Sequence, residues 1–263
     1  MANKGKYYES QFEEATIELL REAHWQYTFG DDIHRKYTDP LIEEDLRNFL
    51  AVQYKDKNLT TSEIDGIVAN LRNIGGQNDY YALRNAFLLY RDGYDFAYSD
   101  GRDNPFRLEY IDFKYPNHNV FRCVNQFVME QGRENRRPDI LLFINGIPVC
   151  IIELKNPTKQ NATIRDAHTQ ICTRYMRDIP ALLKYCALAV ISDGAKNALG
   201  TTYTPFEFFY EWKKIENEDK AGKGLDTLRT LIRGALSLER ILEILRDLSL
   251  IHISEPTRLG MIS

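Results

Sequence analysis

Apolar residues in the first ninety positions recur at helical spacing, so this part of the chain is predicted to be four helices with no strand between them. The second helix is expected to open at Thr38-Asp39-Pro40, which offers a cap and then proline at the first helical position. The third starts at the capping box formed by Thr60 and Glu63. The predicted helices cover about 12–23, 40–50, 60–75 and 79–91.

From Tyr94 onward the pattern changes to short β-branched and aromatic runs separated by Gly, Pro and Asn. Strands are predicted at 108–113, 120–129, 140–144, 149–154 and 185–191, with a helix at 163–176 before the last of them. This order predicts an α/β core with helices beside a sheet. A polar connector at 216–223 then leads to one long amphipathic helix at 225–248.

These patterns divide the chain into a helical segment at 1–92 packed on a core at 93–215, followed by a linker and helix at 216–248. Residues 249–263 continue none of the patterns and resemble translated adapter or vector sequence. They are expected to be a non-native tail, the alternative being a natural frayed terminus. If the tail is foreign, the native protein was interrupted at or before residue 250.

Composition narrows the class of protein. The 263 residues are 43% apolar and 27% charged, the balance of an ordinary globular protein. The four cysteines contain no C-x-x-C pair, which argues against a disulfide framework or a zinc site and favours a reducing cytoplasm. No apolar run is long enough to span a membrane, and no signal peptide precedes the first helix. We therefore expect a cytoplasmic protein without a membrane partner.

The net charge of −4 excludes a protein that holds nucleic acid by bulk positive charge alone. Any DNA contact must be local. Arg133, Arg136 and Arg137 form one candidate patch, although three arginines before a proline are also typical of a solvated turn.

The sequence lacks the motifs of several enzyme classes. There is no G-x-x-x-x-G-K-[ST] or G-x-G-x-x-G phosphate loop, and neither H-E-x-x-H nor G-x-S-x-G occurs. ATP binding through a known loop, zinc hydrolysis and serine hydrolysis are therefore not predicted for this chain.

One constellation remains, in which Pro138-Asp139 precedes Glu153-Leu154-Lys155 by fourteen residues. The Glu-x-Lys spacing also occurs at Glu211 and Glu218, but only Glu153 ends a buried apolar strand that a turn joins to a Pro-Asp. Two carboxylates beside an apolar hairpin need a cation, and Mg²⁺ takes few carboxylates while it keeps several waters.

The constellation suits metal-assisted cleavage of a phosphodiester. Asp139 and Glu153 are candidate metal ligands, and the Leu154 carbonyl between Glu153 and Lys155 is a further oxygen ligand. Positions two apart on a strand share a face, so Lys155 projects beside Glu153, where it can orient water and stabilise charge on the phosphate. The alternative is a plain ion pair at a strand end.

The register of this hairpin decides whether the site exists. With an unbroken two-residue loop at Asn145-Gly146, Asp139 would lie opposite Ile152 and point away from Glu153. We therefore predict an odd loop, such as Ile144 to Gly146, or a bulge between the two carboxylates. Pro148, which lacks an N–H, is compatible with irregular pairing there.

The stretch from Arg137 to Pro157, R-P-D-I-L-L-F-I-N-G-I-P-V-C-I-I-E-L-K-N-P, resembles the nuclease signature of the restriction subunit of type I restriction-modification enzymes. That family is a branch of the PD-(D/E)xK nucleases. Further similar patches occur at 111–113, 125–127, 190–194 and 208–212, so the resemblance covers about residues 10–248. It implies a restriction-endonuclease-like mixed sheet flanked by helices and metal-dependent cleavage of double-stranded DNA.

The resemblance also implies roles for single residues. Asp139 and Glu153 become ligands of Mg²⁺, and Lys155 the catalytic lysine. In this family an acidic residue of the first helix often joins the metal, and Glu13 and Glu14 are the candidates here. Glu13 is the expected ligand because it shares a face with apolar residues, whereas Glu14 lies on a solvent-facing side; the alternative is an ordinary exposed acid near a helix start. The family's Gln-x-x-x-Tyr motif fits Gln170, which is retained as a site residue. Tyr175 is one residue too far and is turned about 140° away, a position that favours Arg174 instead.

In the full family protein an ATP-driven motor follows this region, and methylation and specificity subunits complete the complex. ATP is then expected only through that motor. The alternatives are an inactive nuclease fold that binds DNA or docks subunits, for which Asp139, Glu153 and Lys155 would be unnecessary, and a self-sufficient small endonuclease, for which no sequence-reading element is found.

Overall fold

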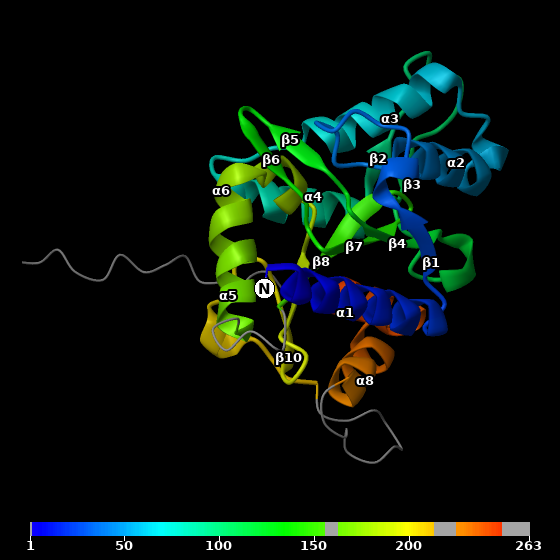
Figure 1. Cartoon of the computed structure of the whole chain (residues 1–263). Coiled ribbons are helices and arrows are strands. Elements are labelled where there is room, and N and C mark those ends of the chain that lie inside the picture. Colours follow the sequence, from blue (N-terminus) through cyan, green and yellow to red (C-terminus); the bar gives the residue numbers. More distant parts are fainter. Residues whose placement is uncertain (1, 156–162, 213–224, 249–263) are drawn as a thin grey trace, which may run out of the picture.

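A six-stranded mixed sheet forms the centre of the protein, as the α/β prediction required (Figure 1). The computed structural model describes residues 2–155, 163–212 and 225–248, with side chains from residue 10 onward. The strands lie in the order β1-β4-β7-β8-β9-β10. Their bounds are β1 Gln26–Phe29, β4 Phe121–Asn125, β7 Ile140–Ile144, β8 Ile147–Leu154, β9 Leu188–Ser192 and β10 Asn197–Gly200. Only the pairs β1–β4 and β8–β9 are parallel.

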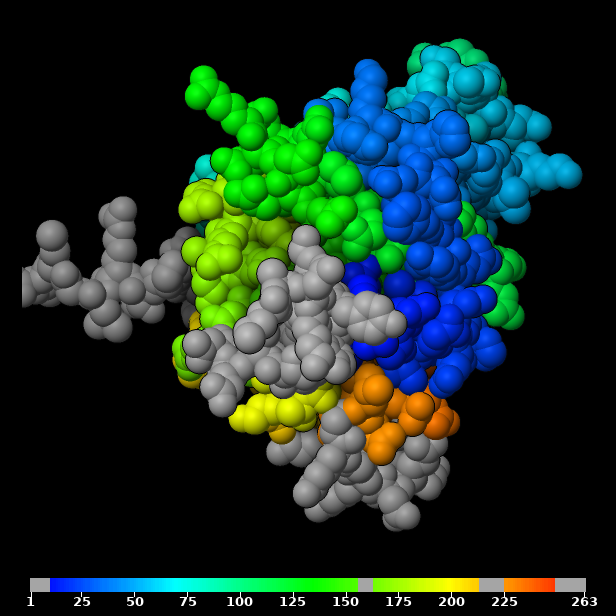
Figure 2. Space-filling view, viewed as in Figure 1, coloured from blue at the N-terminus to red at the C-terminus, as the bar shows by residue number. Residues whose placement is uncertain are grey.

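Helices cover both faces of this sheet. They are α1 Ala2–Glu22, α2 Glu43–Gln53, α3 Thr61–Asn73, α4 Asp79–Asp92, α5 Ile164–Thr169, α6 Met176–Asp178, α7 Pro180–Leu183, α8 Leu225–Ala235 and α9 Leu238–Asp247. Two small hairpins pair β2 Tyr94–Phe96 with β3 Phe106–Leu108, and β5 Met129–Gln131 with β6 Glu134–Arg136. In Figure 2, α5 and α6 form the left of the molecule, α1 the right, and the β5–β6 hairpin the part above them.

Two apolar clusters fill the space between the sheet and its helices. Ile140, Leu142 and Ile144 of β7 join a cluster with α1 to α4, α8 and α9. Leu141 and Phe143 join a second cluster with the segment from α5 to α7. Because neighbouring strand residues point to opposite faces, this alternation assigns one cluster to each face of the sheet.

The helix predictions for the first ninety residues are mostly confirmed, with two corrections. Thr60 and Glu63 form the predicted capping box, and Gly93 ends α4 with a φ of 68°. The expectation of no strand before Tyr94 is wrong, because β1 joins the edge of the sheet beside β4. The second helix begins at Glu43 rather than Pro40, since Asp39 accepts from the Leu41 N–H and pairs with Arg72 instead of capping.

The single long helix predicted at 225–248 is two helices. α8 ends at Ala235 and α9 begins after Ser237, which has extended backbone angles. The Leu236 carbonyl between the helices accepts a hydrogen bond of 2.7 Å from the Trp25 indole. The break lets both helices bury their apolar sides in the first cluster. The predicted connector at 216–223 and the tail at 249–263 lie outside the described residues.

Strand predictions in the core are accurate at β7 and shorter or shifted elsewhere. The run predicted at 108–113 is strand only up to Leu108, and the run at 120–129 is divided between β4 and β5. β10 was not predicted. Leu199 of this strand pairs with Tyr210. Tyr210 follows a short 3-10 helix at Phe206–Phe208.

The β7–β8 hairpin contains the irregularity on which the site depends. Asn145 and Gly146 form a two-residue turn with φ values of 50° and 76°, so the three-residue loop offered as one option is wrong. The predicted bulge is confirmed, because Phe143 pairs with Pro148 whereas Leu142 pairs with Cys150. Val149 is the extra residue, and it lies in the same cluster as the adjacent Cys150. Pro148 sits at this irregular position, as expected.

Replacing Gly146 with alanine is expected to destabilise the fold by about 2–5 kcal/mol in total. The left-handed backbone costs an alanine about 1–2 kcal/mol, and the new Cβ would overlap the Ile42 carbonyl oxygen, which adds about 1–3 kcal/mol. Gly132 is the matched control, because its φ is 63° and no atom lies within 4 Å of an added Cβ. Urea unfolding of both variants measures the difference; equal losses would show that the Ile42 contact is unimportant.

Candidate active site

The bulge brings the two candidate carboxylates to one place. Beyond the bulge Ile140 pairs with Ile152, and the same register carried one residue further puts Asp139 opposite Glu153. By strand alternation Asp139, Glu153 and Lys155 lie on the face that carries Leu141 and Ile151, the face covered by α5 to α7. Without Val149 the two carboxylates would lie on opposite faces.

Hydrogen bonds hold these side chains in position. The Leu154 N–H donates to Asp139 Oδ2 at 2.7 Å, which ties the start of β7 to the end of β8. Lys155 Nζ donates to Glu153 Oε1 at 2.8 Å and to Gln170 Oε1 at 2.7 Å. Gln170 comes from the helix over this face. The lysine is therefore fixed between a carboxylate and an amide from different elements.

Glu153 is the most unusual group of the site, because its carboxylate is only 1% exposed. Burial and the neighbouring Asp139 raise the pKa of Glu153, and Lys155 and the Tyr175 hydroxyl oppose that rise. Its Oε2 is buried and accepts no hydrogen bond from any described residue. A buried carboxylate oxygen without a donor is costly, and a cation would remove that cost.

The helix over the site contains a π-helical segment, Gln170–Tyr175, between α5 and α6. In a π-helix residues five apart come together, and Gln170 Nε2 donates to the Tyr175 hydroxyl at 2.7 Å. The expectation that Tyr175 turns away, and that Arg174 shares the face of Gln170, is therefore wrong. It assumed a regular α-helix, whereas the π segment absorbs the additional residue. Arg174 is exposed.

For the nuclease that the sequence predicts, Tyr175→Phe is expected to slow DNA cleavage about tenfold at saturating DNA, since it removes a hydrogen bond that orients Gln170 and through it Lys155. Arg174→Ala is the matched control from the same segment and is expected to stay within about twofold of the wild type. Single-turnover cleavage with the complete enzyme measures both. A larger loss of cleavage rate in Arg174→Ala than in Tyr175→Phe would contradict the assignment of Tyr175 as the partner of Gln170.

Glu13 does not join the two carboxylates. Its Oε1 accepts hydrogen bonds from Asn125 Nδ2 at 2.7 Å and Gln126 Nε2 at 3.0 Å, at the end of β4. β4 pairs with β7 so that Asn125 lies opposite Ile140, the residue after Asp139, and α1 therefore presents Glu13 at the strand end next to the one that carries Asp139. Among the described residues no three His, Cys, Asp or Glu side chains are close enough to hold a metal ion. Glu14 is exposed, as the helical pattern indicated.

The arginine patch is only partly available. Arg136 pairs with Glu134 at 2.5 Å and with Asp178 at 2.7 Å, so its charge is neutralised within the fold. Arg133 and Arg137 are exposed near the start of β7. No ion pair to either of them is found in the described part of the chain.

Within the ranges that the structure describes, every helix is too short or too polar to cross a bilayer.

Asp139, Glu153 and Lys155 thus lie together at one end of the mixed sheet. Comparison with known proteins shows the family of the chain. Residues 6–208 match the family described as the N terminus of the type I restriction enzyme R protein, and the chain belongs to that family.

Two relatives show the extent of the similarity. The HindI endonuclease subunit of a type I restriction enzyme from Haemophilus influenzae is 29% identical over 254 residues, covering 90% of this chain and 23% of that protein. The EcoprrI endonuclease subunit from Escherichia coli is 31% identical over 162 residues, covering 58% of this chain and 45% of that protein. The chain therefore spans about a quarter of the length of the first relative.

Proposed function

We propose that this chain is the DNA-cleaving region of a type I restriction enzyme, a PD-(D/E)xK nuclease that hydrolyses double-stranded DNA with Mg²⁺. Family membership supports the restriction-enzyme role. The observation that carries the chemistry is the buried Glu153 carboxylate, which has one oxygen on Lys155 and one without a donor, opposite Asp139.

The residues present fit a divalent cation. The orphaned Glu153 Oε2, the adjacent Asp139 and the Leu154 carbonyl provide the hard oxygen donors that Mg²⁺ prefers. When bound, Mg²⁺ supplies Lewis-acid polarisation of the scissile phosphate. The lack of a third acidic group suits Mg²⁺, because this ion usually keeps several waters.

The side chains of the site have separate tasks in the proposed reaction. Lys155 Nζ is placed to stabilise the charge that develops on the phosphate. Gln170 holds Nζ through its carbonyl oxygen, and Tyr175 fixes the Gln170 amide so that this oxygen faces the lysine. Gln170 and Tyr175 are thus positioning residues, and Lys155 is the catalytic one.

In the complete protein we propose that cleavage is coupled to an ATP-driven motor on the same polypeptide and to methylation and specificity subunits. None of the loops that cradle ATP phosphates occurs in this sequence. Defects of this site should therefore leave ATP hydrolysis unaffected.

Mg²⁺ or Mn²⁺ is expected to bind the wild-type chain and to bind Asp139→Ala at least about tenfold more weakly. Saturation at about a hundred times the dissociation constant should stabilise the wild type by about 2.7 kcal/mol. Calorimetric titration and thermal unfolding measure the two effects. Asp95→Ala, which removes an exposed acid in β2, is the control. Equal affinities in the wild type and Asp139→Ala would disprove the assignment of the metal site.

An inactive nuclease fold that only binds DNA is the second candidate. The Lys155–Gln170–Tyr175 chain of hydrogen bonds favours an active site, because a binding module does not need an oriented lysine. The complete enzyme decides between the two: DNA binding without cleavage under conditions that support ATP hydrolysis would favour the inactive fold.

A further inference from the structure

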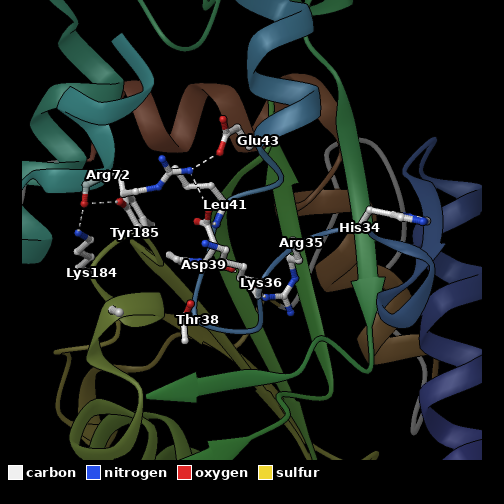
Figure 3. A pocket seen from close by; sticks show the side chains of 12 residues that line it. His34, Arg35, Lys36, Thr38, Asp39, Leu41, Glu43, Arg72, Lys184 and Tyr185 are labelled. Carbon is white, nitrogen blue, oxygen red and sulfur yellow. Dashed lines mark hydrogen bonds and ion pairs between the residues drawn. The ribbon is translucent and has the colours of Figure 1, made fainter. Parts of the chain in front are cut away.

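A second concave site lies away from the carboxylate pair. It is a cavity of about 500 Å³ between the loop at 34–41, the start of α2, the end of α3 and the end of α7 (Figure 3). Asp139, Glu153, Lys155 and Gln170 do not line it. The cavity is large enough for a small ligand, since such sites usually measure about 300–1,000 Å³.

The charges that line this cavity do not balance. Its carboxylates, Asp39 and Glu43, are both bound by Arg72, and Asp39 Oδ2 lies 2.8 Å from the Arg72 guanidinium. Glu43 is also held by Arg47 at 2.6 Å. The other cationic side chains of the lining are Arg35, Lys36 and Lys184. None of these three has an ion pair to a carboxylate within the described ranges, so the cavity carries excess positive charge.

Two of these cations are fixed by neutral partners. Lys184 Nζ donates to the carbonyl oxygens of Arg72 at 2.8 Å and Ile74 at 3.0 Å, at the end of α3. Figure 3 shows Lys184 and Tyr185 together beside the Arg72 backbone, with Arg35 across the cavity. A carbonyl orients an ammonium group but does not neutralise it. The lysine is therefore held in a defined position without an ion pair to a carboxylate in the described part of the chain.

Arg35 is held in the same way. Its Nη1 donates to the carbonyl oxygens of Lys36 and Asp39, its Nη2 donates to that of Val128, and the guanidinium stacks on Phe127 at 3.3 Å from the ring centroid. Its Nε is buried and has no acceptor among the described residues. Burial lowers the pKa of Arg35 to about 10 and also lowers the pKa of Lys184. Both cations are thus partly desolvated, and Asp39, whose charge acts on both, is already paired with Arg72.

We propose that this cavity binds a phosphate group, carried either by a DNA strand or by a free phosphate compound. A multiply charged oxyanion compensates several cations at once, and local positive charge is necessary because the chain as a whole has a net charge of −4.

Isothermal titration with pyrophosphate, in EDTA and at constant salt, tests this proposal. Wild type is expected to bind, and Lys184→Gln and Lys36→Gln are each expected to bind about tenfold more weakly. Glutamine at position 184 can still donate to the α3 carbonyls, and Lys36 is exposed, so at least one variant should remain folded. Lys55→Gln, an exposed lysine outside the cavity, is the control and should bind like wild type.

The possible results distinguish DNA from a free phosphate compound as the source of the phosphate group, and they also show when the proposal is wrong. If a short DNA duplex displaces pyrophosphate from the wild type but not from Lys36→Gln, the cavity is assigned to DNA. Binding that a duplex does not displace assigns it to a free phosphate compound. No binding, or equal affinities in wild type, Lys36→Gln and Lys184→Gln, overturns the proposal. Glu153→Gln should leave pyrophosphate affinity unchanged, so this result is independent of the proposed nuclease.

Discussion

Lys155→Ala in the complete restriction enzyme is expected to reduce DNA cleavage by about 10²–10³-fold, the typical loss when one preorganised electrostatic group is removed from an active site. The side chain is 15% exposed and is oriented by Glu153 and Gln170, so its ammonium group is held in a defined position. Glu153→Ala should cause a loss at least as large, because it removes both the proposed metal ligand and the partner of Lys155. Single-turnover cleavage of duplex DNA measures both.

ATP hydrolysis and DNA translocation supply the decisive control for these variants. Both activities are expected to continue at the wild-type rate, since the proposed motor lies outside this chain. Lys55→Ala, which changes an exposed lysine far from the site in sequence, should leave cleavage intact. Simultaneous loss of cleavage and ATP hydrolysis in Lys155→Ala would mean that this lysine supports the structure and not the reaction.

Phe143→Ala is expected to destabilise the chain by about 3–5 kcal/mol, as is typical of a buried phenylalanine that leaves a cavity. Phe143 is fully buried in β7 and contacts Phe127 with ring centroids 5.2 Å apart. It lies in the cluster under α5 to α7, on the same sheet face as the carboxylates. Denaturant unfolding measures the loss directly.

The matched control for Phe143→Ala is Val52→Ala, because Val52 is 77% exposed on α2 and should lose less than about 0.5 kcal/mol. If Phe143→Ala lost no more than the control, the second cluster would not contribute to stability. The destabilised variant should also bind Mg²⁺ more weakly, since the sheet face that carries Asp139 depends on the same packing.

Local sequence signals determined much of this protein. The capping box at Thr60, the Asn145-Gly146 turn and the apolar runs of β7 and β8 act between residues close in the chain, and the structure contains each of them. The choice of Glu153 over the other Glu-x-Lys sites also depended on a local feature, the buried strand that it ends. Even the bulge followed from the sequence once both carboxylates were required to share a face.

Tertiary structure decided what depends on contacts between distant segments. β1, Gln26–Phe29, is a four-residue run that becomes a strand by pairing with the edge of β4. α8 ends just before Leu236, whose carbonyl accepts a hydrogen bond from the distant Trp25 indole. Tyr175 returns to Gln170 because packing over the sheet favours a π-helical turn, which helical periodicity cannot anticipate. Propensity and spacing act over a few residues, whereas edge pairing, helix breaks and π turns are set by the free energy of packing against elements far away in the sequence.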